Sequence, residues 1–483
     1  MTSSSPITTQ RYLTLPDAFY ERIRPAPVRD PSMRLNARVA AEYGLSLDWL
    51  SGDHALKELS GNVDAAVPSL AMAYGGHQFG QWVPLLGDGR AHMLGQLTTD
   101  AGDTLDVQLK GSGRTRFSRG GDGRATLSAM LREHLIGEAM AGLNIPTTRS
   151  LAVINTGEHV LRDAPEPGAI SVRLARSHLR VGTFEYARDS LSLSELRALT
   201  EFLISDQYAS VATVEQPALA LLEAVSQRQA KLIAQWMLVG FIHGVMNTDN
   251  MALGGETIDY GPCAFMDEFH PQKVFSSIDR FGRYAWGQQP SIALWNLTRF
   301  AHAIEPIVSE QTDKSSSTDS TRDVLAQFGP TFEWHFNSGL ARKLGLDPQH
   351  PAFGDMVSHT LTLLTEQAID FTQFFTALTR AAHGDAAQLD TYGRGKPLLE
   401  WRARWEDLRD TDAAKAMREA NPVIIARNHQ VENALAAATA GDFTLFDRLN
   451  DALATPFASQ EAYRDLEQPP RPEQRVTRTF CGT

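Results

Sequence analysis

The chain has 483 residues, of which 42% are hydrophobic and 21% are charged, so it has enough apolar residues for a large buried core. Its formal net charge of −12 argues against nucleic acid as a partner, because no basic excess is available to follow a phosphate backbone. Only two cysteines occur, Cys263 and Cys481, which excludes a disulfide framework and a zinc site made of four cysteines.

The first nine residues are rich in Ser and Thr and have neither the basic nor the apolar segment of a secretory signal. No run of about 18 apolar residues follows, so we expect no membrane span and no membrane partner. Together with the acidic charge and the scarcity of cysteine, this predicts a cytoplasmic protein.

Residues 1–60 contain several prolines and one short helical pattern at 34–43, which predicts an extension packed on the main body. The aromatic, glycine-rich residues 74–82 predict an ordered loop. His77 in this loop is either catalytic or, more often in such loops, a structural group. A turn at Gly87–Arg90 and a strand at 91–96 predict a hairpin. The turn either admits a phosphate or is an ordinary hairpin turn.

A strand and a helix carry a possible ion pair. Residues 104–110 alternate apolar and polar side chains and end in Lys110, which predicts a half-buried strand. A helical pattern runs from 125 to about 142 and contains Glu133. In kinases a strand lysine is held by a helix glutamate against the nucleotide phosphates. Glu133 alone would be interpreted as an exposed helical residue, but Lys110 and the acidic cluster described below favour the pair.

Arginines and glycines gather on both sides of this strand and helix. The loop 111–124 contains four arginines and the pair Asp122-Gly123, a composition typical of a polyphosphate site or of a solvated loop. Residues 151–161 predict a hairpin that turns at 155–158, and residues 170–176 predict a strand. Arg173 in that strand, and Arg180 soon after it, need either an acidic partner or a phosphate if they are buried.

Residues 243–250, with the letters HGVMNTDN, resemble a kinase catalytic loop, and Asp259-Tyr260-Gly261 resembles the metal-binding motif that follows it. The catalytic Asp of such a loop is replaced by Val245, which cannot accept a proton. Asp249 stands instead beside Asn250. The glycines between Asn250 and Asp259 predict a small hairpin that would bring both to one side, where their oxygens suit Mg²⁺.

Most of the remaining chain is predicted to be helical, with long helices at 191–209 and 217–246 and further helices up to about residue 450. A Ser/Thr-rich segment within 309–323 predicts a mobile loop. Prolines at 469–472 mark an extended tail that carries Cys481.

These motifs together resemble the selenoprotein O family over nearly the whole chain. The resemblance is carried by residues 74–80 (YGGHQFG), 108–113 (QLKGSG), 243–251 (HGVMNTDNM) and 259–262 (DYGP). It implies an α+β, protein-kinase-like bilobal fold with a β-rich N-lobe and a large helical C-lobe. We expect an N-terminal extension at 1–60, the N-lobe at 61–182, the C-lobe at 183–450 and a C-terminal tail at 451–483.

The resemblance also implies an activity: transfer of AMP from ATP to Ser, Thr or Tyr hydroxyls of other proteins, with the nucleotide reversed relative to kinases and with Mg²⁺ or Mn²⁺ as cofactor. Asp249 is then the proton acceptor, Lys110 and Glu133 form the ion pair, and Asn250 and Asp259 bind the metal. The expected nucleotide-binding residues are Gly87, Gly89, Arg90, Lys110, Asp122, Gly123, Arg173, Arg180 and Asp259.

The family further carries a selenocysteine or cysteine near its C-terminus, here Cys481, which implies a link to redox homeostasis through thiol partners. Some members form a disulfide between that region and the loop after the Asp-x-Gly motif. Here Cys263 is the other cysteine, and whether the two pair stays open. Three functions remain for testing: an adenylyltransferase, a conventional kinase, and an ATP-binding pseudokinase scaffold. For the adenylyltransferase, use of UTP beside ATP also stays open. Val245 disfavours the kinase, and the retained metal residues disfavour the scaffold.

Overall fold

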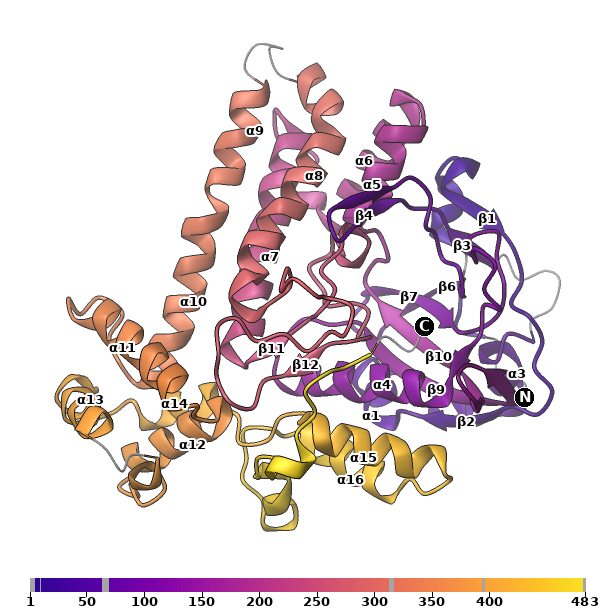
Figure 1. The fold of residues 1–483 in the computed structure, drawn as a ribbon. Helices are drawn as coiled ribbons and strands as arrows, with labels where there is room; N and C mark the ends of the chain where they lie inside the picture. Colours follow the sequence, from indigo (N-terminus) through magenta and orange to yellow (C-terminus); the bar gives the residue numbers. More distant parts are fainter. Residues whose placement is uncertain (1–4, 9, 63–68, 312–316, 393–395, 481–483) are drawn as a thin grey trace.

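The computed structural model describes residues 5–8, 10–62, 69–311, 317–392 and 396–480. Its strands gather on one side of the molecule and its long helices on the other (Figure 1). The fold is therefore α+β, as predicted.

The main sheet has eight strands in the order β1-β3-β6-β7-β10-β9-β2, with β8 paired to β10, and neighbouring strands run antiparallel. The strands are β1 Tyr20–Arg22, β2 Ser32–Leu35, β3 Leu70–Met72, β6 Ala91–Thr98, β7 Thr104–Lys110, β8 Ala125–Thr126, β9 Arg149–Leu161 and β10 Pro165–Ala175. Both β1 and β2 lie within residues 1–60, so this part of the chain supplies two strands of the sheet.

The two faces of the sheet have different partners. Leu105, Val107 and Leu109 of β7 point into an apolar cluster with three short helices, α1 Ala37–Glu42, α2 Leu47–Leu50 and α3 Asp53–Leu59. The alternate residues of β7, which include Gln108 and Lys110, point to the opposite face, as the period of a strand requires. That face meets α4 Leu127–Gly142 and the long loops of the helical part.

The helical part surrounds a second, larger apolar core. Its helices are α5 Val181–Ser190, α6 Leu193–Gln207, α7 Pro217–Leu238, α8 Gln289–Gln311, α9 Ser317–Ala326, α10 Phe328–Leu344, α11 Phe353–Glu366, α12 Phe371–Ala382, α13 Lys396–Leu408, α14 Ala414–Ala420, α15 Asn428–Thr439 and α16 Thr444–Leu453. Short 3₁₀ helices include η4 Thr248–Asn250 in the kinase-like loop. Two small ribbons complete the fold: β4 Gly76–Gln78 with β5 Gln81–Val83, and β11 Phe241–Ile242 with β12 Ala264–Phe265.

The predicted hairpin at 151–161 is wrong, because residues 149–161 form the single long strand β9. Gly157 has a left-handed φ of 70° and interrupts the strand only locally, while the register of β9 with β10 shifts between Pro167 and Ala169. The turn residues at 155–158 thus belong to an irregular stretch of β9, and the chain reverses at 162–164 instead.

The predicted hairpin between Asn250 and Asp259 is also wrong. The segment makes a tight turn, in which Gly255 N donates to Ala252 O at 3.2 Å, but the paired strands nearby are β11 and β12, on either side of it. Long-range bridges hold the segment instead, one from Ala252 to Arg180 and one from Thr257 to Thr147. Asn250 and Asp259 nevertheless reach the same cavity, described below.

Several boundaries also differ from the predictions. Within the predicted loop at 74–82, residues from 76 onward form the β4–β5 hairpin, which ends at Val83. The 87–90 turn leads into β6, whose partners are β3 and β7. The helix predicted at 217–246 ends at Leu238. The predicted helix at 34–43 is shortened by β2 to Ala37–Glu42. Of the predicted loop at 309–323, residues 317–323 begin α9, and 312–316 lie outside the described residues.

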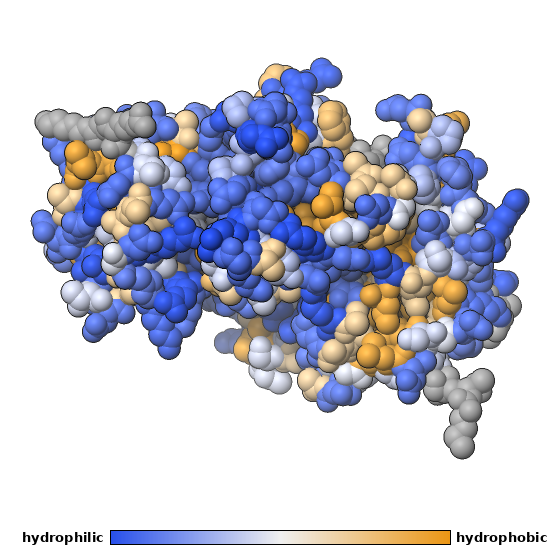
Figure 2. Space-filling view, turned by 90° about the horizontal axis from the view of Figure 1, so that it is seen from below, coloured by the Kyte–Doolittle hydropathy of each residue, from blue (hydrophilic) through white to orange (hydrophobic). Residues whose placement is uncertain are grey.

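The face at the bottom of Figure 1 is hydrophilic over most of its area, and hydrophobic side chains gather toward the strand-rich side (Figure 2). Within the described ranges, none of the helices has the length and apolar character needed to cross a membrane.

Candidate active site

A cavity of about 460 Å³ lies between the polar face of the sheet and the kinase-like loop. It brings together all but one of the residues that the sequence predicted for the site. The lining includes Gly87, Gly89, Arg90, Lys110, Asp122, Gly123, Arg173, Arg180, Asp249, Asn250 and Asp259. Glu133 lines an adjoining cavity, which Arg90 and Asp259 also border.

The ammonium group of Lys110 contacts acidic residues from both cavities. Its Nζ donates to Glu133 Oε1 and, at 2.6 Å, to Asp259 Oδ1, and the side chain is buried. Lys110 ends β7 and Glu133 lies on α4, so the strand and the helix are joined by the ion pair that the sequence predicted. The contact to Asp259 adds the metal-binding motif to the same cluster.

Asp259 carries a negative charge in this cluster. Burial would raise the pKa of its carboxyl, but the cations Lys110, Arg173 and Arg90 outweigh burial and hold the pKa well below its usual range. The residue also adopts a left-handed φ of 68°, which is uncommon outside glycine and occurs where the surroundings fix the backbone. Asp259 is thus an ionised carboxylate on a backbone of uncommon conformation.

Two further buried arginines supply positive charge to the cavity wall. Arg173 lies on β10 opposite Gln108, and Arg180 stands directly before α5. The Nε atoms of both are buried without a hydrogen-bond partner among the described residues. Arg180 donates to the backbone oxygen of Asp249 at 2.8 Å, and its guanidinium stacks 4.6 Å from the centre of the Tyr74 ring. Arg180 Nη2 also lies 3.7 Å from Asp88 Oδ1. The unused Nε donors of both arginines can take a further anionic partner, and a phosphate would meet that need.

Asp249 lines the cavity and has only one of its two carboxylate oxygens in a hydrogen bond with the described residues. Its Oδ2 accepts from Gln78 Nε2 at 3.2 Å, whereas its Oδ1 is buried and has no partner among the described residues. Burial raises the pKa of Asp249 to about 6, against the opposing effects of Arg180 and the Gln78 hydrogen bond. A carboxylate with a raised pKa and a free oxygen is suited to accept a proton.

Asn250 and Asp259 form a donor set that fits a hard divalent cation. Asn250 Nδ2 donates to Val245 O at 3.0 Å, so the amide oxygen is the atom that can bind a metal. His243 is buried, and its Nε2 contacts Ile258 O at 3.0 Å, which ties the loop to the residue before Asp259. The described residues contain no group of three or more His, Cys, Asp or Glu that could hold a metal. Two protein oxygens that leave room for phosphate oxygens and water suit Mg²⁺ or Mn²⁺.

The sequence prediction missed several residues of the cavity wall: Tyr74, Gln78, Asp88, Arg162 and Asn247. Gln78 belongs to the YGGHQFG motif, which was interpreted as a structural loop. Its neighbour His77 faces away from this cavity and contacts Glu185 Oε1 through Nδ1 at 2.6 Å, in a separate cavity. Side chains alternate along β4, so a strand assignment for residues 76–78 would have separated His77 from Gln78.

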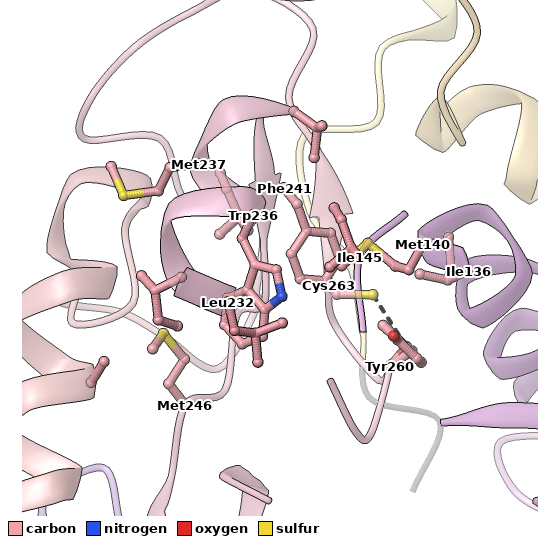
Figure 3. Close-up of a cluster of buried hydrophobic side chains, with 14 of the residues drawn as sticks. Ile136, Met140, Ile145, Leu232, Trp236, Met237, Phe241, Met246, Tyr260 and Cys263 are labelled. Atoms are coloured by element: carbon pink, nitrogen blue, oxygen red, sulfur yellow. Dashed lines mark hydrogen bonds between the residues drawn. The ribbon is translucent and has the colours of Figure 1, made fainter. Parts of the chain in front are cut away.

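Cys263 lies in the apolar core directly after the metal-binding motif (Figure 3). The side chain is fully buried in the apolar cluster that includes Phe241, Trp236 and Met140, and its Sγ donates weakly to Tyr260 O at 3.5 Å. Burial raises the pKa of the thiol to about 12, so the group is a protonated thiol at neutral pH and a poor nucleophile.

The C-terminal tail packs on the loop that follows this motif. Thr479 N donates to Phe275 O at 2.8 Å, and Ser277 N donates to Thr479 O at 2.9 Å. The tail therefore reaches the rim of the active-site region at Thr479. Cys481, expected to bind thiol partners, lies outside the described residues.

Comparison with known proteins gives one consistent answer. The family model described as "Protein adenylyltransferase SelO" matches residues 6–454. A relative from Shewanella denitrificans, named "Protein nucleotidyltransferase YdiU", is 47% identical and is covered over 98% of its length by 99% of this chain. Relatives of the same name from Brevibacillus brevis and Rhizobium meliloti are 46% and 45% identical, each over 98% of this chain and 96% and 98% of their own length.

The fold, the cavity and these likenesses define an enzyme of the nucleotidyltransferase class. The chain belongs to the SelO family of protein adenylyltransferases.

Proposed function

We propose that this protein transfers AMP from ATP to Ser, Thr or Tyr hydroxyls of other proteins and releases pyrophosphate. The observation that carries the proposal is the carboxylate of Asp249, which has one unpaired oxygen among the described residues and lines the same cavity as the cations Lys110, Arg173 and Arg180. A proton acceptor and phosphate-binding cations in one cavity are what nucleotidyl transfer to a hydroxyl requires.

The nucleotide phosphates are held by the buried cations. Lys110 is fixed by Glu133 and Asp259, while Arg173 and Arg180 have unused Nε donors. We place the β- and γ-phosphates against the two arginines, so that the α-phosphate lies nearest Asp249, in the reversed orientation. Gly87, Gly89, Arg90, Asp122 and Gly123 line the remaining part of the same cavity and are assigned to the nucleotide.

Asn250 and Asp259 are the proposed metal residues. Their two oxygens fit Mg²⁺ or Mn²⁺, and the ion would neutralise charge on the phosphate oxygens as the leaving group departs. Asp259 is ionised in the protein, because its pKa is held low, and is therefore ready to bind a cation at neutral pH.

The transfer step assigns one role to Asp249. The proton of the target hydroxyl moves to Asp249 Oδ1 while the hydroxyl oxygen bonds to the α-phosphorus. The bond from the α-phosphorus to the bridging oxygen breaks, and pyrophosphate leaves with its electron pair. Val245, at the position of the kinase base, is apolar and cannot take part.

We also propose that the two halves of the fold correspond to kinase lobes. The sheet with α4 supplies Lys110, Glu133 and Arg173, as an N-lobe would, and the helical part supplies the loop with Asp249, Asn250 and Asp259. We assign residues 61–182 and 183–450 to the two lobes, and β1 and β2 from residues 1–60 add to the sheet of the first lobe.

Labelled nucleotides test the proposal against its alternatives. The protein is incubated with Mg²⁺ or Mn²⁺, a mixture of candidate target proteins, and ATP labelled at the α- or the γ-phosphate. We expect protein labelling from the α-phosphate alone. Labelling from the γ-phosphate alone would establish a kinase, and the absence of both would favour a scaffold. A parallel reaction with α-labelled UTP shows whether uridylyl transfer also occurs.

A further inference from the structure

The β4–β5 hairpin is bonded to the kinase-like loop, residue by residue. His77 N donates to Thr248 Oγ1 at 2.6 Å, Gln78 Nε2 to Asp249 Oδ2 at 3.2 Å, and Phe79 N to Asn247 Oδ1 at 3.0 Å. Three successive hairpin residues therefore hold three successive residues of the loop that carries Asp249. Of these three bonds, the one from Gln78 reaches the carboxylate itself.

We propose that Gln78 is a positioning residue for Asp249, a role that rests on the proposed function of Asp249 as the proton acceptor. The amide of Gln78 occupies Oδ2 of the carboxylate. Oδ1 is thereby the oxygen left without a hydrogen-bond partner among the described residues, and the residue itself lines the cavity. A donor on one oxygen fixes the rotation of the carboxylate plane, and this rotation decides whether the other oxygen faces an incoming hydroxyl.

The close approach of hairpin and loop depends on two glycines. Gly76 has a φ of 155°, and a Cβ there would lie 3.0 Å from Thr248 Oγ1 and 3.2 Å from Asp249 Oδ1. A Cβ on Gly182, at the start of α5, would lie 2.3 Å from Gly75 O and 3.3 Å from Asp249 Cα. The backbones are thus packed closely enough that a side chain at either position would push the hairpin away from Asp249.

The hairpin is also fixed from its other side, so that Gln78 does not move freely with respect to the loop. His77 Nδ1 contacts Glu185 Oε1 of α5 at 2.6 Å, and the His77 ring packs 5.2 Å from Trp82 and 5.2 Å from Trp295. Figure 1 shows β4 beside the start of α5. The donor that touches Asp249 is therefore supported by α5 and α8, outside the cavity wall.

A matched pair of variants separates positioning from hairpin packing. Gln78→Leu removes the amide donor, and Gln81→Leu makes the same substitution at the exposed partner of Gln78 in the hairpin register. For Gln78→Leu we expect kcat to fall on the order of 10- to 100-fold while KM for ATP stays within about twofold, because the phosphate-binding residues are untouched. For Gln81→Leu we expect both constants to match the wild type. Equal kcat values for the two variants, or a loss confined to KM, would overturn the proposal.

A double-mutant cycle tests whether Gln78 acts through Asp249. In the Asp249→Ala background, Gln78→Leu is expected to leave the residual transfer rate unchanged, because the group it positions is already absent. A further fall by the same factor as in the wild-type background would overturn the proposal, since Gln78 would then act on another group. The rates are followed with whichever phosphate label the wild type transfers. Which phosphate label reaches the target protein tests the proposed function. The ratio of transfer rates with and without Gln78→Leu tests the role of Gln78.

Discussion

Buried arginines in the helical part and in the cavity differ in how completely their hydrogen-bond donors are paired. In the helical part, Arg427 is 1% exposed and has its guanidinium fork filled: Nη1 donates to Asp267 Oδ1 at 2.5 Å and to Asp370 Oδ2 at 2.8 Å, and Nη2 donates to Asp370 Oδ1 at 3.1 Å. In the cavity, Arg173 and Arg180 are 5% and 6% exposed, and each has a buried Nε without a partner among the described residues.

The difference teaches how to tell a structural charge from a functional one. The carboxylates around Arg427 offset the free-energy cost of burying its charge. Asp370 also caps α12 by accepting from Gln373 N at 2.8 Å. Arg173 has no ion pair among the described residues, and Arg180 Nη2 lies 3.7 Å from Asp88 Oδ1, a longer contact than those of Arg427. Both arginines border a cavity that a polyphosphate would fill. Such incomplete pairing next to an open cavity marks a binding site more clearly than burial alone.

The largest effect is expected at the proton acceptor in the cavity. Asp249→Asn keeps the shape of the side chain but removes its ability to accept a proton. We expect transfer to fall on the order of 10³-fold, with the midpoint of thermal unfolding within a few degrees of the wild type. Transfer from α-labelled ATP and a thermal melt measure the two quantities. Activity close to that of the wild type would show that another group takes the proton.

Breaking the ion-pair cluster of Arg427 with Asp267 and Asp370 is expected to lower the stability of the fold and to leave the transfer rate unchanged. Arg427→Met leaves the carboxylates of Asp267 and Asp370 without their cation, which we expect to lower the free energy of unfolding by about 3 kcal/mol. The rate per folded molecule should stay unchanged, because the cluster lies outside the cavity. Chemical denaturation and a rate measurement corrected for the folded fraction check both parts. Loss of rate with full stability would refute the assignment of Arg427 to structure.

The opposite outcome is expected for the cavity arginine. Arg173→Met removes a cation whose Nε is unpaired, so the free energy of unfolding should change by no more than about 1 kcal/mol. The affinity for ATP should fall on the order of 10-fold or more, because one charge-assisted phosphate contact is lost. Nucleotide titration by calorimetry is the measurement. An unchanged affinity would remove Arg173 from the phosphate site.

Lys343 sharpens the comparison, because it is a buried cation without an ion pair within the described part of the chain. Its Nζ lies 4.3 Å from the centre of the Phe375 ring, and burial lowers its pKa to about 7. The unfolded state then binds more protons between about pH 7 and pH 10, so the stability of the wild type should rise with pH in this window. Lys343→Met should be more stable at pH 7, on the order of 1–3 kcal/mol, and this advantage should shrink toward pH 10. A constant difference between the two proteins across that range would contradict the titration.

The sequence predicted the parts of the fold that local pattern determines. The alternation in residues 104–110 gave β7 with its correct ends, and the apolar face around Leu131 gave α4 within two residues. The cavity residues on these elements, Lys110 and Glu133, were therefore placed correctly as a pair. Their contact follows from a strand and a helix that succeed each other in the chain.

The failures have a common physical cause, because they depend on partners far away in the sequence. Turn-forming residues at 155–158 lie within β9, because β2 and β10 pair along both edges of that strand and absorb its irregularity. The chain between Asn250 and Asp259 is held by bridges to Arg180 and Thr147 and not by a local hairpin. Gln78 was missed for the same reason: its contact to Asp249 spans 171 positions.

The most direct test of the central claim measures the leaving group. One reaction with ATP and a target protein is followed for the AMP bound to protein, for pyrophosphate and for ADP. We expect one pyrophosphate for each AMP transferred, no ADP formed with labelled protein, and the loss of both products in Asp249→Asn. Formation of ADP in step with protein labelling would contradict the account, because it would show that the γ-phosphate, and not the α-phosphate, lies next to Asp249.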